Sequence, residues 1–388
     1  MRFLILIPVL MAFFSGSSSV AQQLDSAYLQ EYAQPINLED PEYQSFGMLD
    51  TIVPGYSFFF TAEQHWRSIN TQIQFSFLRY LHQHANVRHL IVEGGYSYGF
   101  LLNEYISSGD EQLLDKVMKD VPICPENQKV LFRNIHDYNR YLPEADKIEV
   151  TGIDLEHSPV LVLQTLNRLL PTEEPPRKIR KYITELKELH ASPYYNEAEV
   201  KKFFKRFAKH VERHSTDYVA YWDKDFPIFA MIVENSVQGF QFTWLRSTLF
   251  QKSWQERETS MYRNFLTIAP TLKAGNYYAQ FGALHTDIKE PRIWDFPSLA
   301  NRLNFQANSP VNGEVLTISR YVRNMSDNYE RLGEHEELQE LVNTLESRFH
   351  DSVVLFSLIG PGSPFREMSK TFQFIMLIDE DLEADACD

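Results

Sequence analysis

The sequence lacks the features of several common protein classes. Its 388 residues include only two cysteines, Cys124 and Cys387, which excludes a zinc cluster built on cysteine pairs. These two could form a disulfide in an oxidising compartment. The chain also lacks an excess of basic residues, because 37 Lys and Arg stand against 52 Asp and Glu for a net charge of −15. Nucleic-acid-binding domains need a basic surface, so we expect no nucleic-acid partner.

Long hydrophobic runs are also missing, except at the N-terminus. Residues 1–21 carry one positive charge at Arg2, then an apolar run from Phe3 to Phe14, then the small-residue end Ser19-Val20-Ala21. That order is typical of a secretory signal peptide, and the apolar run is too short for a spanning helix. We therefore expect cleavage near Ala21, a secreted or periplasmic protein, and no membrane span after cleavage. An N-terminal membrane anchor is the alternative.

Several catalytic signatures are weak or missing as well. The sequence has no HExxH zinc motif and no glycine-rich phosphate-binding loop. We also expect no GxSxG nucleophile elbow. Serine and cysteine nucleophiles are therefore poorly supported, and any chemistry has to come from other side chains.

The sequence does contain buried strands that end in titratable residues. The apolar strand from Tyr56 to Phe60 is followed by Glu63 and His65, and the next apolar strand ends at Glu93. A helix with one apolar face, over residues 68–84, joins the two strands. The pattern predicts a strand–helix–strand unit with polar groups at both strand ends.

Two later strands are expected to end in the same way. One covers residues 148–153 and ends at Asp154, with His157 close behind; the other, from Tyr277 to Phe281, leads into His285. Asp154 and His157 could simply cap the following helix. Ligands bind outside the carboxyl ends of strands in open parallel sheets. The sequence therefore predicts an α/β fold with a central, mainly parallel sheet flanked by helices, and one site at that edge.

The middle of the chain has a different composition. A proline-rich break near residue 171 is followed by charged amphipathic helix patterns over residues 177–190 and 197–214. We interpret residues from about 171 to 240 as a helical cap inserted into a single domain of residues 22–388. The polar lead-in, residues 22–54, is expected to have little regular structure.

The residues at the strand ends support two kinds of chemistry. Glu63, His65, Glu93 and His285 supply two imidazoles and two carboxylates, which can activate a water by general base catalysis. A divalent cation such as zinc, manganese or iron could instead bind to His65, Glu93 and His285. A lone histidine at a strand end is usually a structural residue, and it is the repeated placement that favours a function.

These motifs resemble those of the erythromycin esterase-like superfamily, which also includes haem-binding ChaN-type proteins and TraB/Tiki proteins. Glu63 and His65 match its Gly-Glu-x-His motif, with Ala62 in the place of Gly, and Glu93 matches the Glu that ends the next strand. His285 matches the late His motif, although Phe281-Gly282-Ala283 stands where the esterase branch usually has His-Asn-x. A long helix predicted over residues 242–268 is similar to the esterase Arg-Asp-x-x-Met-x-x-Asn motif through Arg257, Glu258, Met261 and Asn264.

The resemblance implies an α/β fold with a helical cap and three alternative functions. The first is hydrolysis of an ester, lactone or amide in a small-molecule or peptide substrate, with or without a divalent metal. In that case His65 is expected to be the base, Glu63 or Glu93 to orient it, His285 to assist, and Arg257 to bind the developing oxyanion. The second is metal or haem binding without turnover, as in the ChaN-type branch. The third is an inactive relative that binds a partner or glycan, which the Ala62 replacement favours.

Overall fold

The computed structural model describes most of the chain between residues 26 and 379. The described residues are 26–119, 121, 123–192, 194, 196–241, 250–289, 296–322, 336–350, 352–363 and 365–379. The predicted signal peptide and Cys387 lie outside the described residues, and with them the predicted cleavage and the pairing of Cys387 with Cys124. Within the described residues, no helix is long and apolar enough to cross a membrane.

One mixed sheet of eight strands organises the described residues. Its strands lie in the order β1-β7-β8-β6-β2-β5-β3-β4. Only β7 runs antiparallel to its neighbours, and every other pair is parallel, so the predicted α/β fold is confirmed. The strand bounds are β1 (Ala33–Ile36), β2 (Phe58–Glu63), β3 (Val87–Gly95), β4 (Glu149–Asp154), β5 (Asn276–Gly282), β6 (Val315–Val322), β7 (Val353–Ser357) and β8 (Phe374–Ile378).

The strand ends differ from those expected, and the difference affects the site. β2 begins at Phe58 and continues through Glu63, because its ladder with β5 extends to the pair Glu63↔Gly282. β3 likewise passes Glu93 and pairs Gly95 with Asp154 of β4 after an irregularity. Glu63 and Glu93 are therefore strand residues and do not lie beyond the strands. The sheet ladder fixes their backbones, and the site gains rigidity.

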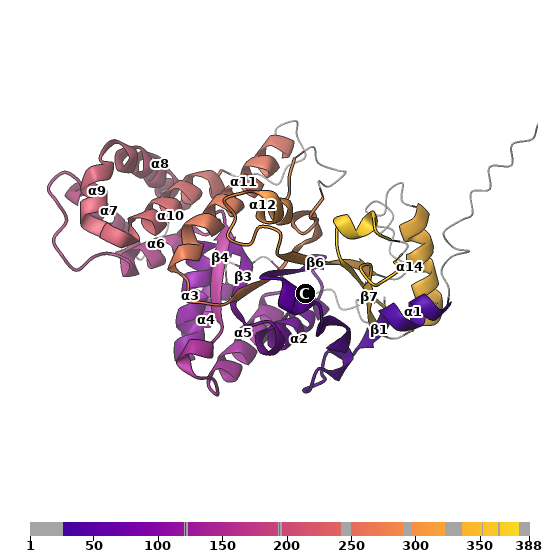
Figure 1. The fold of residues 1–388 in the computed structure, drawn as a ribbon. Helices are drawn as coiled ribbons and strands as arrows, with labels where there is room; N and C mark the ends of the chain where they lie inside the picture. The colour runs from indigo at the N-terminus through magenta and orange to yellow at the C-terminus, as the bar shows by residue number, and fades with distance from the viewer. Residues whose placement is uncertain are drawn as a thin grey trace, which may run out of the picture.

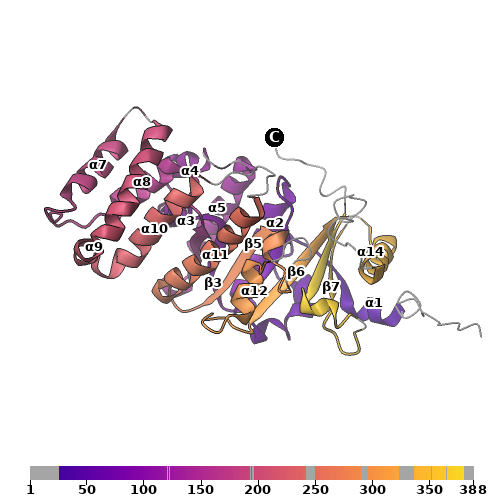
Figure 2. The same cartoon turned by 90° about the horizontal axis from the view of Figure 1, so that it is seen from above.

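Helices cover both faces of the sheet (Figures 1 and 2). Successive strand residues point to opposite faces, and Phe59 packs on one face while Phe58 and Phe60 pack on the other. The Phe59 face is covered by α2 (Ile69–His84), α3 (Tyr96–Ser108), α4 (Glu111–Met118) and α5 (Pro125–Asn139). The opposite face is covered by α6 (Pro159–Arg168), α11 (Phe250–Ile268) and α12 (Leu299–Phe305). The predicted long helix is thus observed from Phe250, and residues 242–249 lie outside the described residues.

The segment from about residue 171 to 240 forms a group of helices at one end of the sheet (Figure 1, left). It holds α7 (Arg180–Ala191), α8 (Glu197–Arg213), α9 (Ser215–Trp222) and α10 (Phe226–Gly239). Aromatic side chains hold these helices together, with Trp222 stacked on Phe229 at 3.8 Å between ring centroids and Phe207 edge-on to Phe229 at 5.8 Å. The sequence analysis did not predict α9 or α10.

The lead-in has more structure than expected. Residues 26–55 hold α1 (Ser26–Tyr32), β1 and two short 3-10 helices, Gln44–Leu49 and Val53–Gly55. The prediction of little regular structure was wrong because β1 gains its order from pairing with β7, more than 300 residues further along the chain. A four-residue strand at a sheet edge leaves no periodic pattern in its own sequence. With α14 (Glu336–Arg348), α1 packs against the β1–β7–β8 end of the sheet.

Candidate functional site

The structure brings together all five residues that the sequence singled out. Glu63 is the last residue of β2, Glu93 lies near the end of β3, and His285 follows β5. Because β2, β5 and β3 are neighbours in the sheet, their carboxyl ends converge. His65 follows two residues after Glu63, and Arg257 reaches the group from α11.

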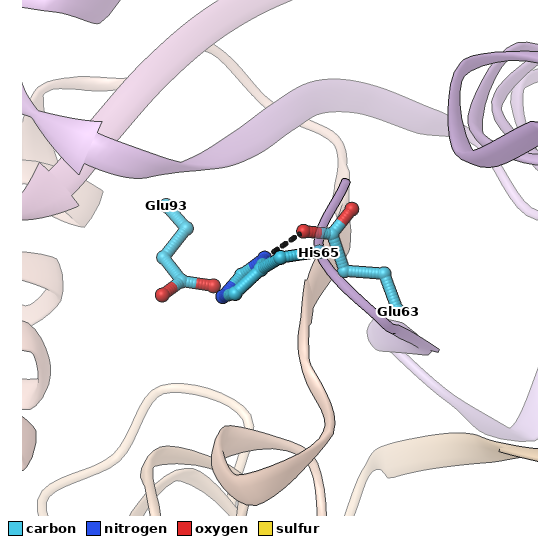
Figure 3. Close-up of side chains that lie close together, drawn as sticks. All are labelled: Glu63, His65 and Glu93. Carbon is cyan, nitrogen blue, oxygen red and sulfur yellow. Dashed lines mark hydrogen bonds and ion pairs between the residues drawn. The ribbon is translucent and has the colours of Figure 1, made fainter. Parts of the chain in front are cut away.

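His65 is the most exposed member of the group. Its Nδ1 lies 2.7 Å from Glu63 Oε1, and 38% of its side chain is exposed. Burial opposes a charge on the ring, but the hydrogen bond to Glu63 and the negative charge of Glu93 outweigh it and raise the pKa of His65. Figure 3 shows the imidazole between the two carboxylates, with its second nitrogen directed towards Glu93.

Glu93 is held in place on both oxygens. Its Oε2 accepts a hydrogen bond from the Gly282 amide at 2.8 Å, and its Oε1 accepts one from Arg257 Nη2 at 2.7 Å. Burial alone would raise the pKa of Glu93, but the positive charges of His285 and Arg257 hold it well below the usual range. Glu93 is therefore a fixed carboxylate at neutral pH.

Gly282 leaves room for these two side chains. A Cβ at this position would lie 3.2 Å from His65 Nε2 and 3.5 Å from Glu93 Oε2. Few Cβ atoms make contacts as tight as the first, so glycine lets the backbone amide approach Glu93 without displacing the imidazole.

Arg257 lies deeper than its expected role requires. Only 2% of its side chain is exposed. Its Nε donates to both carboxylate oxygens of Asp154, at 3.0 and 3.1 Å, and its Nη2 donates to Asp154 at 2.6 Å and to Glu93. These donors are directed at buried carboxylates, and the expected oxyanion role stays a prediction. Asp154, which sequence alone left as a helix cap or a site residue, is a buried partner of Arg257.

His285 is enclosed, in contrast to His65. Its Nδ1 contacts Glu258, its Nε2 lies 3.3 Å from Glu93 Oε1, and 3% of its side chain is exposed. Burial opposes its charge, but Glu258 and Glu93 outweigh that effect and raise the pKa of His285 to about 10. The indole of Trp254 covers both buried cations, 5.8 Å from the His285 ring and 5.0 Å from the Arg257 guanidinium carbon.

This arrangement changes the expected metal ligands. Ligand atoms of Glu63, His65 and Glu93 all lie within 4.8 Å of one another. His285 does not join this group, because its ring nitrogens face Glu258, Glu93 and Arg257. One imidazole and two carboxylates suit a hydrolytic divalent cation, so these three residues could hold one.

The helix motif around Arg257 has a structural explanation. Arg257 and Glu258 are adjacent on α11 and contact Asp154 and His285 respectively. Two turns further on, Asn264 Nδ2 donates to the Ile153 carbonyl at 2.7 Å and so fixes the end of β4. Sequence reasoning noted Glu258 only as a replacement for Asp in the motif, and missed its contact with His285.

One sequence spacing bears on the expectation that there is no serine nucleophile. Residues 95–99 read Gly-Tyr-Ser-Tyr-Gly, the GxSxG spacing of a nucleophile elbow, which the sequence reasoning overlooked. Ser97 is fully buried in the first turn of α3, and its amide donates to Glu156 Oε1 at 3.0 Å. Within the described part of the chain, Ser97 forms no hydrogen bond with a histidine. Its burial therefore agrees with a structural role, and burial raises the pKa of its partner Glu156 to about 7.

Comparison with known proteins identifies the fold. The sequence matches no protein-family profile and no curated protein. An erythromycin esterase variant in its open conformation is similar in structure, with a TM-score of 0.64 and 13% identity over 89% of this chain and 97% of that one. A succinoglycan biosynthesis protein has a TM-score of 0.63 and 13% sequence identity, and the match covers 91% of this chain and 95% of that one. A protein from Bacillus cereus has a TM-score of 0.57 and 14% sequence identity, and the match covers 92% of this chain and 97% of that one. These likenesses extend over most of each chain and show a shared fold.

Proposed function

We propose that this chain, which has the fold of the erythromycin esterase-like superfamily, is a hydrolase in which His65 activates water against an ester, lactone or amide. The substrate is a small molecule or peptide. The observation that carries the proposal is the Glu63–His65 pair: one ring nitrogen is bonded to a carboxylate, and 38% of the side chain remains open to solvent.

The pair has the arrangement that general base catalysis requires. A carboxylate that accepts a hydrogen bond from Nδ1–H keeps the proton on that nitrogen and leaves Nε2 as the base. Neutral His65 then takes a proton from water as the water attacks the carbonyl carbon, and the negative charge of Glu63 stabilises the imidazolium that forms. Since Glu63 and Glu93 raise the pKa of His65, the base is strong but needs a pH above that pKa.

Buried residues next to the Glu63–His65 pair fix the position of Glu93. Arg257 and the Gly282 amide hold Glu93 beside the imidazole, and Asp154 and Glu258 hold Arg257 and His285 in turn. Fixed charges of this kind do not need to reorganise during the reaction. We therefore assign Arg257 and His285 positioning roles, with His65 as the residue that moves the proton.

The test is a panel of ester, lactone and amide substrates measured with the parent protein and the variant His65→Ala. We expect kcat/KM of any substrate found to fall at least about a hundredfold in the variant, the usual size of a general-base contribution. In the parent, the rate should rise with pH through the raised pKa of His65.

A matched control is available elsewhere in the chain. His84 also has 38% of its side chain exposed and lies 3.4 Å from a carboxylate, Asp50, but it ends α2 away from the site. His84→Ala should retain the parental rate. Parental turnover by a folded His65→Ala protein would contradict the proposal.

A metal-dependent version of the same site is the second candidate, favoured by the cluster of Glu63, His65 and Glu93. A divalent cation bound there would lower the pKa of a coordinated water and so supply the nucleophile. The two versions respond differently to a chelator, which should abolish turnover in the metal-dependent case and leave it nearly intact otherwise. Metal analysis of the purified protein provides a readout that does not depend on activity.

A further inference from the structure

Trp66, the residue that follows His65, has an unusual combination of backbone and exposure. Its φ is 69°, in the left-handed region, and 51% of the residue is exposed. Large side chains rarely adopt this conformation because Cβ approaches the following carbonyl oxygen. The turn is fixed by its neighbours, since Asn70 Nδ2 donates to the Gln64 carbonyl at 2.8 Å.

The other non-glycine residues with positive φ have ordinary explanations. Within the described residues they are Tyr43, Asn86, Cys124 and Asp223. Asn and Asp adopt this region more readily than other residues. Tyr43 and Cys124 are buried, so packing offsets the backbone cost. Trp66 has neither explanation, and its ring packs on no other aromatic ring in the described part of the chain.

An exposed aromatic side chain on a strained turn beside a candidate base points to a ligand, because strain of this kind persists at functional sites. We infer that Trp66 is a substrate-binding platform on which a ring of the substrate stacks, so that the scissile bond attached to this ring lies over His65. This inference rests on the proposed hydrolase function.

The chemistry at the site restricts the ring. Aromatic side chains stack on aryl rings and cover apolar ring faces. The neighbouring carboxylates of Glu63 and Glu93 disfavour an anionic group. The substrate class is therefore a neutral or cationic ring-bearing ester, lactone or amide. Stacking would hold the reacting carbonyl near the base, which is a positioning contribution.

Kinetics with two esters of the same acid provide the first test. We expect Trp66→Gly to raise KM for 4-nitrophenyl butanoate about tenfold, the size of one lost aromatic contact, and to leave kcat/KM for ethyl butanoate within about twofold. Trp66→Phe, which keeps an aromatic face, should retain most of the parental KM. Tyr194→Ala removes another exposed ring, which is 87% accessible on the cap. This variant should leave KM and kcat/KM unchanged for both esters.

Stability separates this role from a structural one. Glycine adopts positive φ without a steric cost, so the melting temperature of Trp66→Gly should equal or exceed that of the parent. A lower melting temperature together with equal losses on both esters would show that Trp66 supports the fold, and the inference would be overturned.

A binding measurement keeps the inference distinct from the hydrolase proposal. The chain has five tryptophans, so 5-fluorotryptophan labelling should give five ¹⁹F resonances, and Trp66→Phe identifies that of Trp66. Titration with benzyl alcohol, a neutral aryl ring, should shift this resonance most, in the parent and in His65→Ala alike. If the shift occurs but no ester is hydrolysed, the platform stands and the hydrolase proposal fails. If the Trp66 resonance does not move up to about 10 mM benzyl alcohol, a concentration that would reveal even millimolar affinity, the platform is wrong.

Discussion

The two histidines of the site have similar sequence settings and opposite environments. His65 and His285 each follow a buried strand and a short turn. His65 contacts one carboxylate through Nδ1 and keeps a third of its side chain in solvent. His285 lies between Glu258 and Glu93, beneath Trp254 and almost fully buried.

The difference shows what decides whether a histidine is a base or a fixed cation. Two buried carboxylates raise the pKa of His285 to about 10, so its ring remains protonated at neutral pH and has no free lone pair. The pKa of His65 is also raised, but its exposed ring can exchange protons with solvent or substrate. Three predictions test this contrast.

The largest expected effect is the loss of stability on removing the cation at the centre of the enclosed half. Arg257→Met leaves Asp154 and Glu93 buried with fewer positive partners. Breaking a buried charge network in this way usually costs about 3–5 kcal/mol. We therefore expect the free energy of unfolding, measured by urea denaturation at pH 7, to fall by about that amount.

The control for this prediction lies on the same helix. Arg263 is half exposed and pairs with Glu234 at 3.0 Å. An exposed pair contributes less than about 1 kcal/mol, so Arg263→Met should be nearly neutral. Equal losses in the two variants would mean that the buried network does not stabilise the fold.

The second prediction concerns the pH dependence of stability. The pKa of His285 is about 10 in the folded protein and about 6.5 in an unfolded chain. The folded state therefore binds more protons between these values, and stability falls as pH rises. The contribution is complete below about pH 6.5 and is lost by about pH 10, with a magnitude on the order of a few kcal/mol.

Urea midpoints measured from pH 6 to pH 10 would check this slope. The variant His285→Gln cannot titrate at that position, so its midpoint should depend less on pH than that of the parent, whatever its absolute stability. The groups that face His285 are Glu258, Glu93 and Arg257, and none of these has an ordinary pKa in this range. Parallel pH curves for the two proteins would rule out a charged His285.

Much of this site could be predicted from sequence because its residues are tied to strand ends. A buried apolar strand is visible as a run of residues, and parallel strands bring their carboxyl ends to one edge. Glu63, His65, Glu93 and His285 were therefore found without structural information. The α/β class followed from the same alternation of strands and helices.

What could not be predicted depends on side-chain depth and on distant pairing. Nothing local distinguishes an arginine that faces substrate from one buried against Asp154, so the sequence could not show the contacts of Arg257. The same holds for Glu258, whose partner His285 is 27 residues away. The strand β1 depends on β7, far along the chain, and the strained turn at Trp66 has no signature in residue type. Depth and partner are properties of the assembled sheet.

The smallest of the three effects, on rate, comes from the exposed half. Glu63→Gln keeps a hydrogen-bond acceptor for His65 Nδ1 but removes the negative charge. Since Glu63 raises the pKa of His65, the variant should have a lower pKa, and the acidic limb of its pH–rate profile should move to lower pH. Its maximal rate should fall about tenfold because a weaker base removes the proton from water and the imidazolium is less stabilised. The matched change Asp50→Asn, beside the equally exposed His84, should leave both the limb and the rate unchanged. An acidic limb that stays at the parental pH in Glu63→Gln would show that His65 is not the group that titrates. The assignment of His65 as the base, in contrast to His285 as a fixed cation, would then be wrong.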